Sequence, residues 1–208
     1  MNRLGLGTVL LAALVLLAGP APVAAIDRAA APERKVPWPP EDTDGAWRPA
    51  PAEAYETFTV QACGSTVVVS AGDVRTQEYR ATEVEGGAIR VEVRGGLTSD
   101  LSRESDAAQI DELVNSGVVE VTVSADGLTE TYSYAGPSLL GSFDAVEAGA
   151  FAAHGLPALS YYEAGQITER VVLSEDEDAE TIVSDEVLTD TTQNVADVCR
   201  LLDETDDD

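Results

Sequence analysis

The stretch VVEVTVSADGLTETYSYA, residues 118–135, carries the clearest structural signal in the chain. On each side of Asp126-Gly127, apolar and polar residues alternate, which is the pattern of a half-buried strand. An Asp-Gly pair between two alternating runs is typical of a tight hairpin, because both residues tolerate the positive φ angles that such a turn needs. The stretch therefore predicts an antiparallel hairpin, with Tyr132 and Tyr134 on one face of its second strand.

Similar runs, either alternating or rich in β-branched residues, recur along the chain. They predict further strands in residues 58–62, 67–69, 76–84, 89–94, 148–154, 158–163, 166–173 and 181–183. We expect Gly86-Gly87 to join two of these strands through a tight turn, and Ala164-Gly165 to join two others. Many short antiparallel strands indicate an all-β protein, either β-barrel-like or a curled β-sandwich.

Two short helices are expected beside these strands. One begins near Ser105 and ends before Gly117, with Ala107, Ile110, Leu113 and Val114 on one face. The other is C-terminal: Asp190 and Gln193 resemble a capping box, followed by an apolar stripe of Val195, Val198, Leu201 and Leu202.

Residues 1–25 have the features of a secretion signal. Arg3 precedes a short apolar stretch, prolines follow it, and residues 23–25 end in small side chains, as signal peptidase requires. The stretch is shorter than the ~20 apolar residues that span a bilayer. We therefore expect cleavage after Ala25 and a secreted, extracellular mature chain.

Residues 26–54 are rich in proline, which favours an extended arm. A β-rich domain is expected over residues 55–202, followed by an acidic, disordered tail over residues 203–208. Both tryptophans, Trp38 and Trp47, lie in the arm. Because exposing such a ring forgoes about 2 kcal/mol or more of burial energy, we expect the arm to lie along the domain; contact with a sugar or partner is the alternative.

Cys63 and Cys199 are the only cysteines in the chain. In an oxidising compartment they are expected to form one disulfide, which would tie the first core segment to the C-terminal helix. A zinc site would need four ligands, and His154 is the only histidine. Residues 42–45 only resemble the start of a calcium loop, and residues 175–178 are typical of a solvated turn, so no metal site is predicted.

The composition excludes several functional classes. The formal net charge is −26, and nucleic acids and anionic membranes bind through Lys and Arg, so neither is an expected partner of the mature chain. No phosphate loop or dinucleotide fingerprint is present, and no cofactor is expected. No serine stands in a nucleophile elbow that His154 could serve, and carboxylates are too numerous to single out a catalytic pair.

With residues 57–64 (TFTVQACG) and 195–202 (VADVCRLL) in view, the chain resembles small secreted actinobacterial proteins of unknown function. In these proteins a signal peptide precedes a β-rich domain with an early Cys-Gly and a late helical cysteine. The resemblance implies export, the β-rich fold and the pairing of Cys63 with Cys199. It implies no activity and no site residues.

Taken together, these features favour a secreted, non-enzymatic domain that binds a small apolar ligand or a cell-surface partner. The mouth of a barrel-like fold is where such folds commonly bind a ligand. The candidate lining residues are Tyr132, Tyr134, Tyr161 and Tyr162, half of which we expect to serve the core instead. The competing expectations are a secreted hydrolase that uses carboxylates, and an acidic cation-binding or inhibitor protein.

Overall fold

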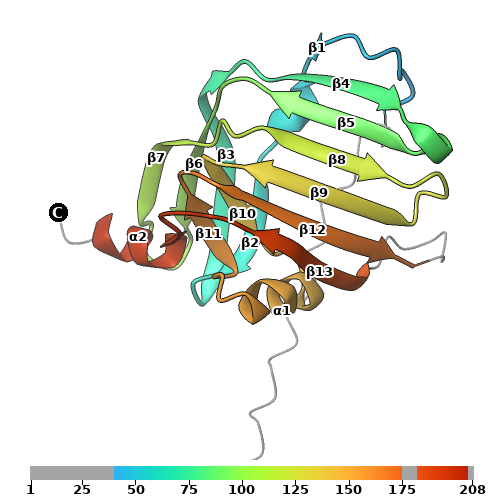
Figure 1. Cartoon of the computed structure of the whole chain (residues 1–208). Coiled ribbons are helices and arrows are strands. Elements are labelled where there is room, and N and C mark those ends of the chain that lie inside the picture. The colour runs from blue at the N-terminus through green and yellow to red at the C-terminus, as the bar shows by residue number, and fades with distance from the viewer. Residues whose placement is uncertain (1–39, 175–181, 206–208) are drawn as a thin grey trace, which may run out of the picture.

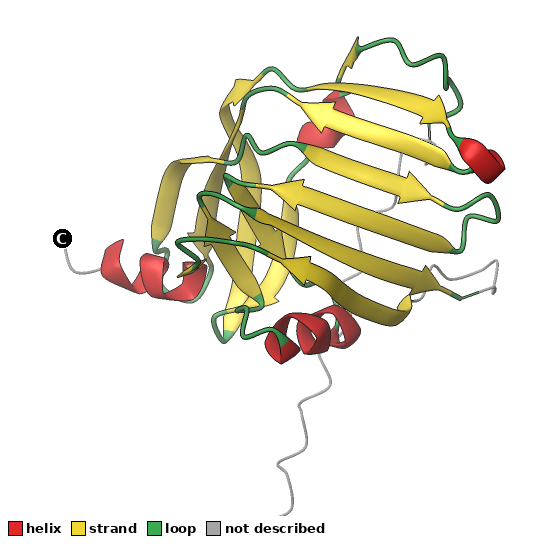
Figure 2. Cartoon of the chain, in the orientation of Figure 1, coloured by secondary structure: helices red, strands yellow, loops and turns green. Residues whose placement is uncertain are grey.

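The computed structural model describes residues 40–174 and 182–205, whose strands form three sheets of seven, four and three strands (Figure 1). All strand pairs in them are antiparallel. The sheets do not close into a barrel, so the arrangement is sandwich-like, with two short α-helices beside it (Figure 2). The predicted all-β class is confirmed, and the curled sandwich rather than the barrel is the form it takes.

The seven-stranded sheet contains the hairpin of residues 118–135. Its strands, in spatial order, are β1 (Arg48–Pro49), β4 (Glu78–Glu83), β5 (Ile89–Arg94), β8 (Val119–Val123), β9 (Thr129–Ala135), β12 (Gln166–Leu173) and β13 (Ile182–Asp190). The turn between β8 and β9 is closed by the Ser124 amide, which donates to the Thr129 carbonyl at 2.9 Å. The link between β4 and β5 is longer than predicted, because a short 3-10 turn, η2 (Glu85–Gly87), carries the two glycines at φ 86° and 77°.

The two smaller sheets stand together at one end of the strands of the large sheet (Figure 1). One contains β2 (Phe58–Ala62), β3 (Ser65–Arg75), β6 (Leu97–Arg103) and β7 (Gln109–Val114); the other contains β10 (Ser138–Gly141), β11 (Leu159–Tyr162) and β14 (Ala196–Asp197). Fully buried Val60, Val67, Leu101 and Leu159 join them in one apolar cluster with Val198 and Leu202 of the last helix. Ala164-Gly165 joins β11 to β12, which lie in different sheets, so the predicted tight turn between paired strands is wrong.

The helix predicted from Ser105 onwards is wrong, because this segment forms the turn between β6 and β7 and then the edge strand β7. Asp106 Oδ1 accepts a hydrogen bond from the Ala108 amide at 3.2 Å, and Ala107 has φ 60°. This side-chain-closed turn competes with a helical start. Strand β6 was missed because its buried positions include polar Thr98, Ser99 and Arg103, which hide the alternation.

The strand predicted over residues 148–154 is also wrong, since α1 (Ala145–Ala153) occupies this region. Asp144 Oδ1 caps the helix by accepting from the amides of Val146 and Glu147, at 2.8 and 3.0 Å. The sequence signal was Asp144 with Glu147 three residues later, a helix-start pattern that precedes a run of alanines.

The C-terminal helix is confirmed, but α2 (Val198–Thr205) begins later than predicted. Asp190 ends β13 and turns the chain by accepting from the Thr192 amide at 2.9 Å, and β14 precedes the helix. Asp197 instead stands at the helix start, where its Oδ1 accepts from the Cys199 amide at 2.9 Å. The first three residues of the predicted tail, 203–205, belong to α2, and residues 206–208 lie outside the described residues.

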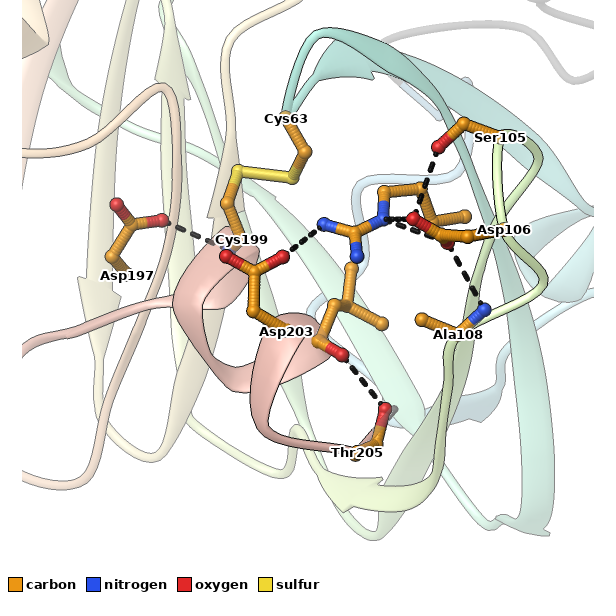
Figure 3. Close-up of polar contacts among 10 residues, drawn as sticks. Cys63, Ser105, Asp106, Ala108, Asp197, Cys199, Asp203 and Thr205 are labelled. Atoms are coloured by element: carbon orange, nitrogen blue, oxygen red, sulfur yellow. Dashed lines mark hydrogen bonds and ion pairs between the residues drawn. A yellow bond between two sulfur atoms is a disulfide. The ribbon is translucent and has the colours of Figure 1, made fainter. Parts of the chain in front are cut away.

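The disulfide between Cys63 and Cys199 forms as predicted, with a Cα–Cα distance of 5.1 Å, and it ties α2 to the turn after β2 (Figure 3). A second connection lies beside it. Buried Arg103 of β6 bridges Asp106, in its own turn, and Asp203 of α2. The paired aspartates raise the pKa of the Arg103 guanidinium well above its usual range.

The described part of the arm runs along β4 and adds the two-residue strand β1 at that edge of the large sheet. Asp44 forms a bridge with Thr82, and β1 pairs with β4 through Arg48 and Tyr79. Trp47 is half-buried and lies under two guanidinium groups. The Cζ atoms of Arg94 and Arg80 are 3.8 and 4.8 Å from the centroid of its ring. Trp38 and the signal-like segment lie outside the described residues.

Candidate functional site

A cavity of about 210 Å³ lies where the three sheets meet. Its apolar wall comes from all three: Phe58, Val60, Val69 and Ala71 from the four-stranded sheet, Leu139, Leu140 and Leu159 from the three-stranded sheet, and Tyr134 from the seven-stranded sheet. Val60, Val69 and Leu159 are fully buried, so their strands hold this wall rigidly. Such a space suits a small ligand with a predominantly apolar surface.

A few polar side chains are placed along the same wall. Ser70 and Ser99 line the cavity, as does Asn115, whose amide group donates to Ser99 Oγ at 3.3 Å. Asn115 Oδ1 also accepts from the Leu139 amide at 3.0 Å, which fixes the side chain between two sheets. These groups can orient a ligand that carries one hydroxyl, carbonyl or amide.

Two rings lie together at a more exposed part of the lining. Phe58 and Phe143 have ring centroids 5.7 Å apart, and Phe143 is 44% exposed. The 3-10 turn η1 (Ala52–Tyr55), from the arm, lines the cavity beside them. The Tyr55 hydroxyl accepts from the Gln77 amide at 3.2 Å, which holds this turn on the domain. The cavity is thus completed by the end of the arm.

Among the four predicted lining residues, Tyr134 lines the cavity. Tyr132 stacks on Tyr134, with centroids 5.8 Å apart, and its hydroxyl donates to Glu130. Tyr162 is a core residue with no exposed surface, and its hydroxyl donates to the Tyr134 carbonyl at 2.8 Å. Tyr161 packs against the cluster under α2. The four tyrosines therefore do not form one lining.

A second notable feature is a group of carboxyl side chains between α1 and the β13 edge of the large sheet. Glu169 is on β12, Asp185 is diagonal to it on β13, and Glu147 comes from α1. Glu169 is 6% exposed, and its Oε2 atom has no hydrogen-bond partner. Both carboxylate oxygens of Asp185 are buried and also lack a partner.

The environment of these groups raises their pKa values. Burial, reinforced by the charges of Asp185 and Glu147, raises the pKa of Glu169 to about 8. Burial and the neighbouring Asp144 and Asp185 raise the pKa of Glu147 to about 7, and burial raises that of Asp185 to about 6. Glu169 is consequently protonated for the most part at neutral pH.

Other predicted candidates occupy ordinary structural positions. His154 is the exposed C-cap residue of α1. Asp42 and Asp44 of the calcium-like run both pair with Arg48. The acidic run 175–178 lies outside the described residues. Over residues 40–174 and 182–205, no group of three or more His, Cys, Asp or Glu side chains is arranged to hold a metal ion.

Sequence reasoning missed most of the cavity, because its wall is assembled from strands distant in the chain. Asn115 lies in a segment predicted as a helix, and Phe143 precedes a helix predicted as a strand. The buried acids were overlooked because no acidic residue stands in a long apolar run. One signal was present: Glu169 occupies the same strand face as Ile167 and Val171, where alternation calls for an apolar residue.

Comparison of the chain with protein-family models, curated proteins and solved structures finds no match. No helix within the described residues is long and apolar enough to cross a membrane.

Proposed function

We propose that this protein is a secreted, non-enzymatic domain that binds a small, mainly apolar ligand in the cavity between its three sheets. The observation that carries the proposal is the apolar wall built by buried Val60, Val69 and Leu159, with Asn115 and Ser99 as orienting polar groups. A rigid apolar wall with few polar groups is the usual composition of a small-molecule site.

The size of the cavity limits the ligand. At about 210 Å³ it is smaller than the roughly 300–1,000 Å³ of sites for drug-sized molecules. An engineered apolar cavity of about 150 Å³ binds benzene. A single aromatic ring or a short aliphatic chain with one polar group is the class of ligand that fits.

The proposal of secretion rests on two features. Residues 1–25 have the regions of a signal peptide, and the disulfide between Cys63 and Cys199 is typical of an oxidising compartment.

The experiment is calorimetric titration of the mature protein with p-cresol and indole as probes. Ala71→Phe places a ring in the cavity and should weaken binding at least tenfold. Ala125→Phe, in the exposed turn between β8 and β9, is the matched control and should leave binding unchanged. Equal binding by both variants would refute the site, as would failure of the unmodified protein to bind either probe.

A secreted hydrolase is the second candidate, favoured by the raised pKa values of Glu147 and Glu169. A carboxyl group protonated at neutral pH is what a general acid requires. The cavity lining, however, contains Glu56 and not these two residues. Activity on aryl ester or glycoside substrates that disappears in Glu169→Gln and persists in Glu56→Gln would establish this function; no activity in the unmodified protein would exclude it for those substrates.

A further inference from the structure

One face of the seven-stranded sheet, here called the inner face, is built from three rows of side chains set by the strand register. The rows are Tyr79, Val93, Val119, Tyr134 and Ile167; then Ala81, Val91, Val121, Tyr132, Glu169 and Val187; then Glu83, Ile89, Val123, Glu130, Val171 and Asp185. The alternate positions of β4, β5 and β12 carry the ion pairs of Arg80, Arg90 and Arg170 on the outer face. The sheet is thus polar outside and apolar or acidic inside.

Three valines in the middle of the inner face are almost completely buried. Val91, Val121 and Val123 are 1%, 3% and 2% exposed. Neither of the two apolar clusters formed by described residues includes any of them. The smaller sheets stand at one end of the strands of the large sheet, and α1 lies beside β13 (Figure 1).

The far side of this face carries buried carboxyl groups, and no described cation pairs with them. Glu169 and Asp185 have buried oxygens without hydrogen-bond partners, and the arginines of the same strands lie at outer-face positions. An unpaired buried carboxyl group costs free energy unless it takes up a proton or meets a cation. The covering layer should therefore combine apolar side chains with positive charge.

Residues 26–39 of this chain have that composition and a suitable place of entry. In chain order they contain the basic pair Arg34 and Lys35 and then the apolar Val36 and Trp38. The described chain begins at Pro40 and joins the edge of the sheet at Asp44, which is bridged to Thr82 of β4. The segment therefore ends close to the β4 edge of the inner face.

The reach of the segment matches the spacing of the strands. An extended proline-rich chain advances ~3.1 Å per residue, so a segment extended from Pro40 would reach ~6 Å over two residues, to position 38, and ~19 Å over six, to position 34. Adjacent strands are ~4.8 Å apart, so β5 is ~5 Å and β12 is ~19 Å from β4. An arm crossing the strands places the tryptophan over the valines and the basic pair over the acids.

We propose that residues 26–39 pack across the inner face as an intramolecular strap, with Trp38 against Val91 and Val121, and Arg34 and Lys35 beside Glu169 and Asp185. The strap supplies an apolar layer over the valines and cations beside the buried carboxyl groups. It is independent of ligand binding in the cavity.

Zero-length carbodiimide cross-linking tests this directly, because Lys35 is the only lysine in the chain. The mature protein should give a cross-link from Lys35 to Glu130, Glu169 or Asp185, identified by mass spectrometry. In an equal mixture of ¹⁴N- and ¹⁵N-labelled protein, the two cross-linked peptides should always carry the same isotope, which shows that the link lies within one chain. Cross-links to outer-face Glu92, Glu120 or Glu186, links between two chains, or no link to an inner-face carboxyl group would overturn the proposal.

Fluorescence provides a second readout that needs no cross-link. In Trp47→Phe, the emission of Trp38 should be blue-shifted relative to the denatured protein. Combining R34E and K35E with Trp47→Phe should shift the emission of Trp38 to the red and raise its quenching by acrylamide at least twofold. Adding R90E and R170E, which reverses two charges on the outer face, is the matched control and should leave the emission unchanged. Water-like emission of Trp38 before any charge reversal would also overturn the proposal.

Discussion

Arg103 of β6 donates a hydrogen bond to Asp203 of α2 at 2.6 Å, across 100 positions of sequence. Its Nε also donates to Asp106 at 2.9 Å, and the arginine side chain is only 7% exposed. The aspartates are more exposed, at 37% and 65%. One buried guanidinium therefore closes the turn between β6 and β7 and holds the C-terminal helix beside it.

Arg103→Met should lower the free energy of unfolding by about 2–3 kcal/mol, because it removes two charge-assisted hydrogen bonds but leaves the aspartates access to water. Arg103→Lys should recover only part of this loss, since an ammonium group cannot bridge both carboxylates with the geometry of a guanidinium. Urea unfolding measures both. Arg200→Met, on the exposed side of α2, is the control and should change stability by less than about 0.5 kcal/mol.

Replacing Cys63 and Cys199 together with serine should lower stability by about 2–5 kcal/mol, the usual range for a native disulfide in a small secreted domain. The disulfide and Arg103 hold the same helix. The losses in the free energy of unfolding should therefore not be additive when both are removed in one variant. Strict additivity in urea unfolding would show that the two connections act independently.

The stability of the protein should fall as the pH rises from about 4.5 to about 8. Burial gives Glu147 and Glu169 folded-state pKa values of about 7 and 8, above the ordinary glutamate value of 4.5. The folded state therefore holds more protons than the unfolded state in this window, and raising the pH favours unfolding, by up to about 1.4 kcal/mol per pH unit for each group.

Glu169→Gln should flatten this pH dependence, whereas Glu186→Gln, on the exposed outer face of β13, should not. Thermal unfolding at a series of pH values measures the slope. A slope that is the same in the Glu169→Gln variant as in the unmodified protein would show that Glu169 ionises normally in the folded state.

The mature protein should begin at or within a few residues of Ile26, because residues 23–25 form a signal-peptidase site. Mass spectrometry of the protein recovered from culture medium measures the N-terminus. Recovery only from membranes, with residues 1–25 intact, would contradict secretion.

Local patterns predicted the parts of the fold that local chemistry controls. The Asp126-Gly127 hairpin and the strand over Ile89–Arg94 follow from alternation and turn residues, and the disulfide follows from the two cysteines of a chain that is expected to be exported. The segment after Ser105 has helical spacing of apolar residues, but Asp106 closes a turn and pairing with β6 makes the segment a strand. Long-range pairing thus outweighed local propensity.

The candidate site was less predictable, because it depends on which strands become neighbours. Tyr134 was identified, but nothing in the sequence places Val60 and Leu140 in the wall of one cavity or brings Asn115 between two sheets. Alternation places Glu169 on the apolar face of its strand, but it does not show which elements bury that face.

The most direct test of ligand binding in the cavity is the measurement of intermolecular NOEs between unlabelled p-cresol and the ¹³C-labelled methyl groups of the mature protein. We predict NOEs to methyl groups that line the cavity, those of Val69, Leu140 and Leu159. NOEs only to methyl groups on exposed Val183 or Leu188, or none at a probe concentration that saturates binding, would contradict the account.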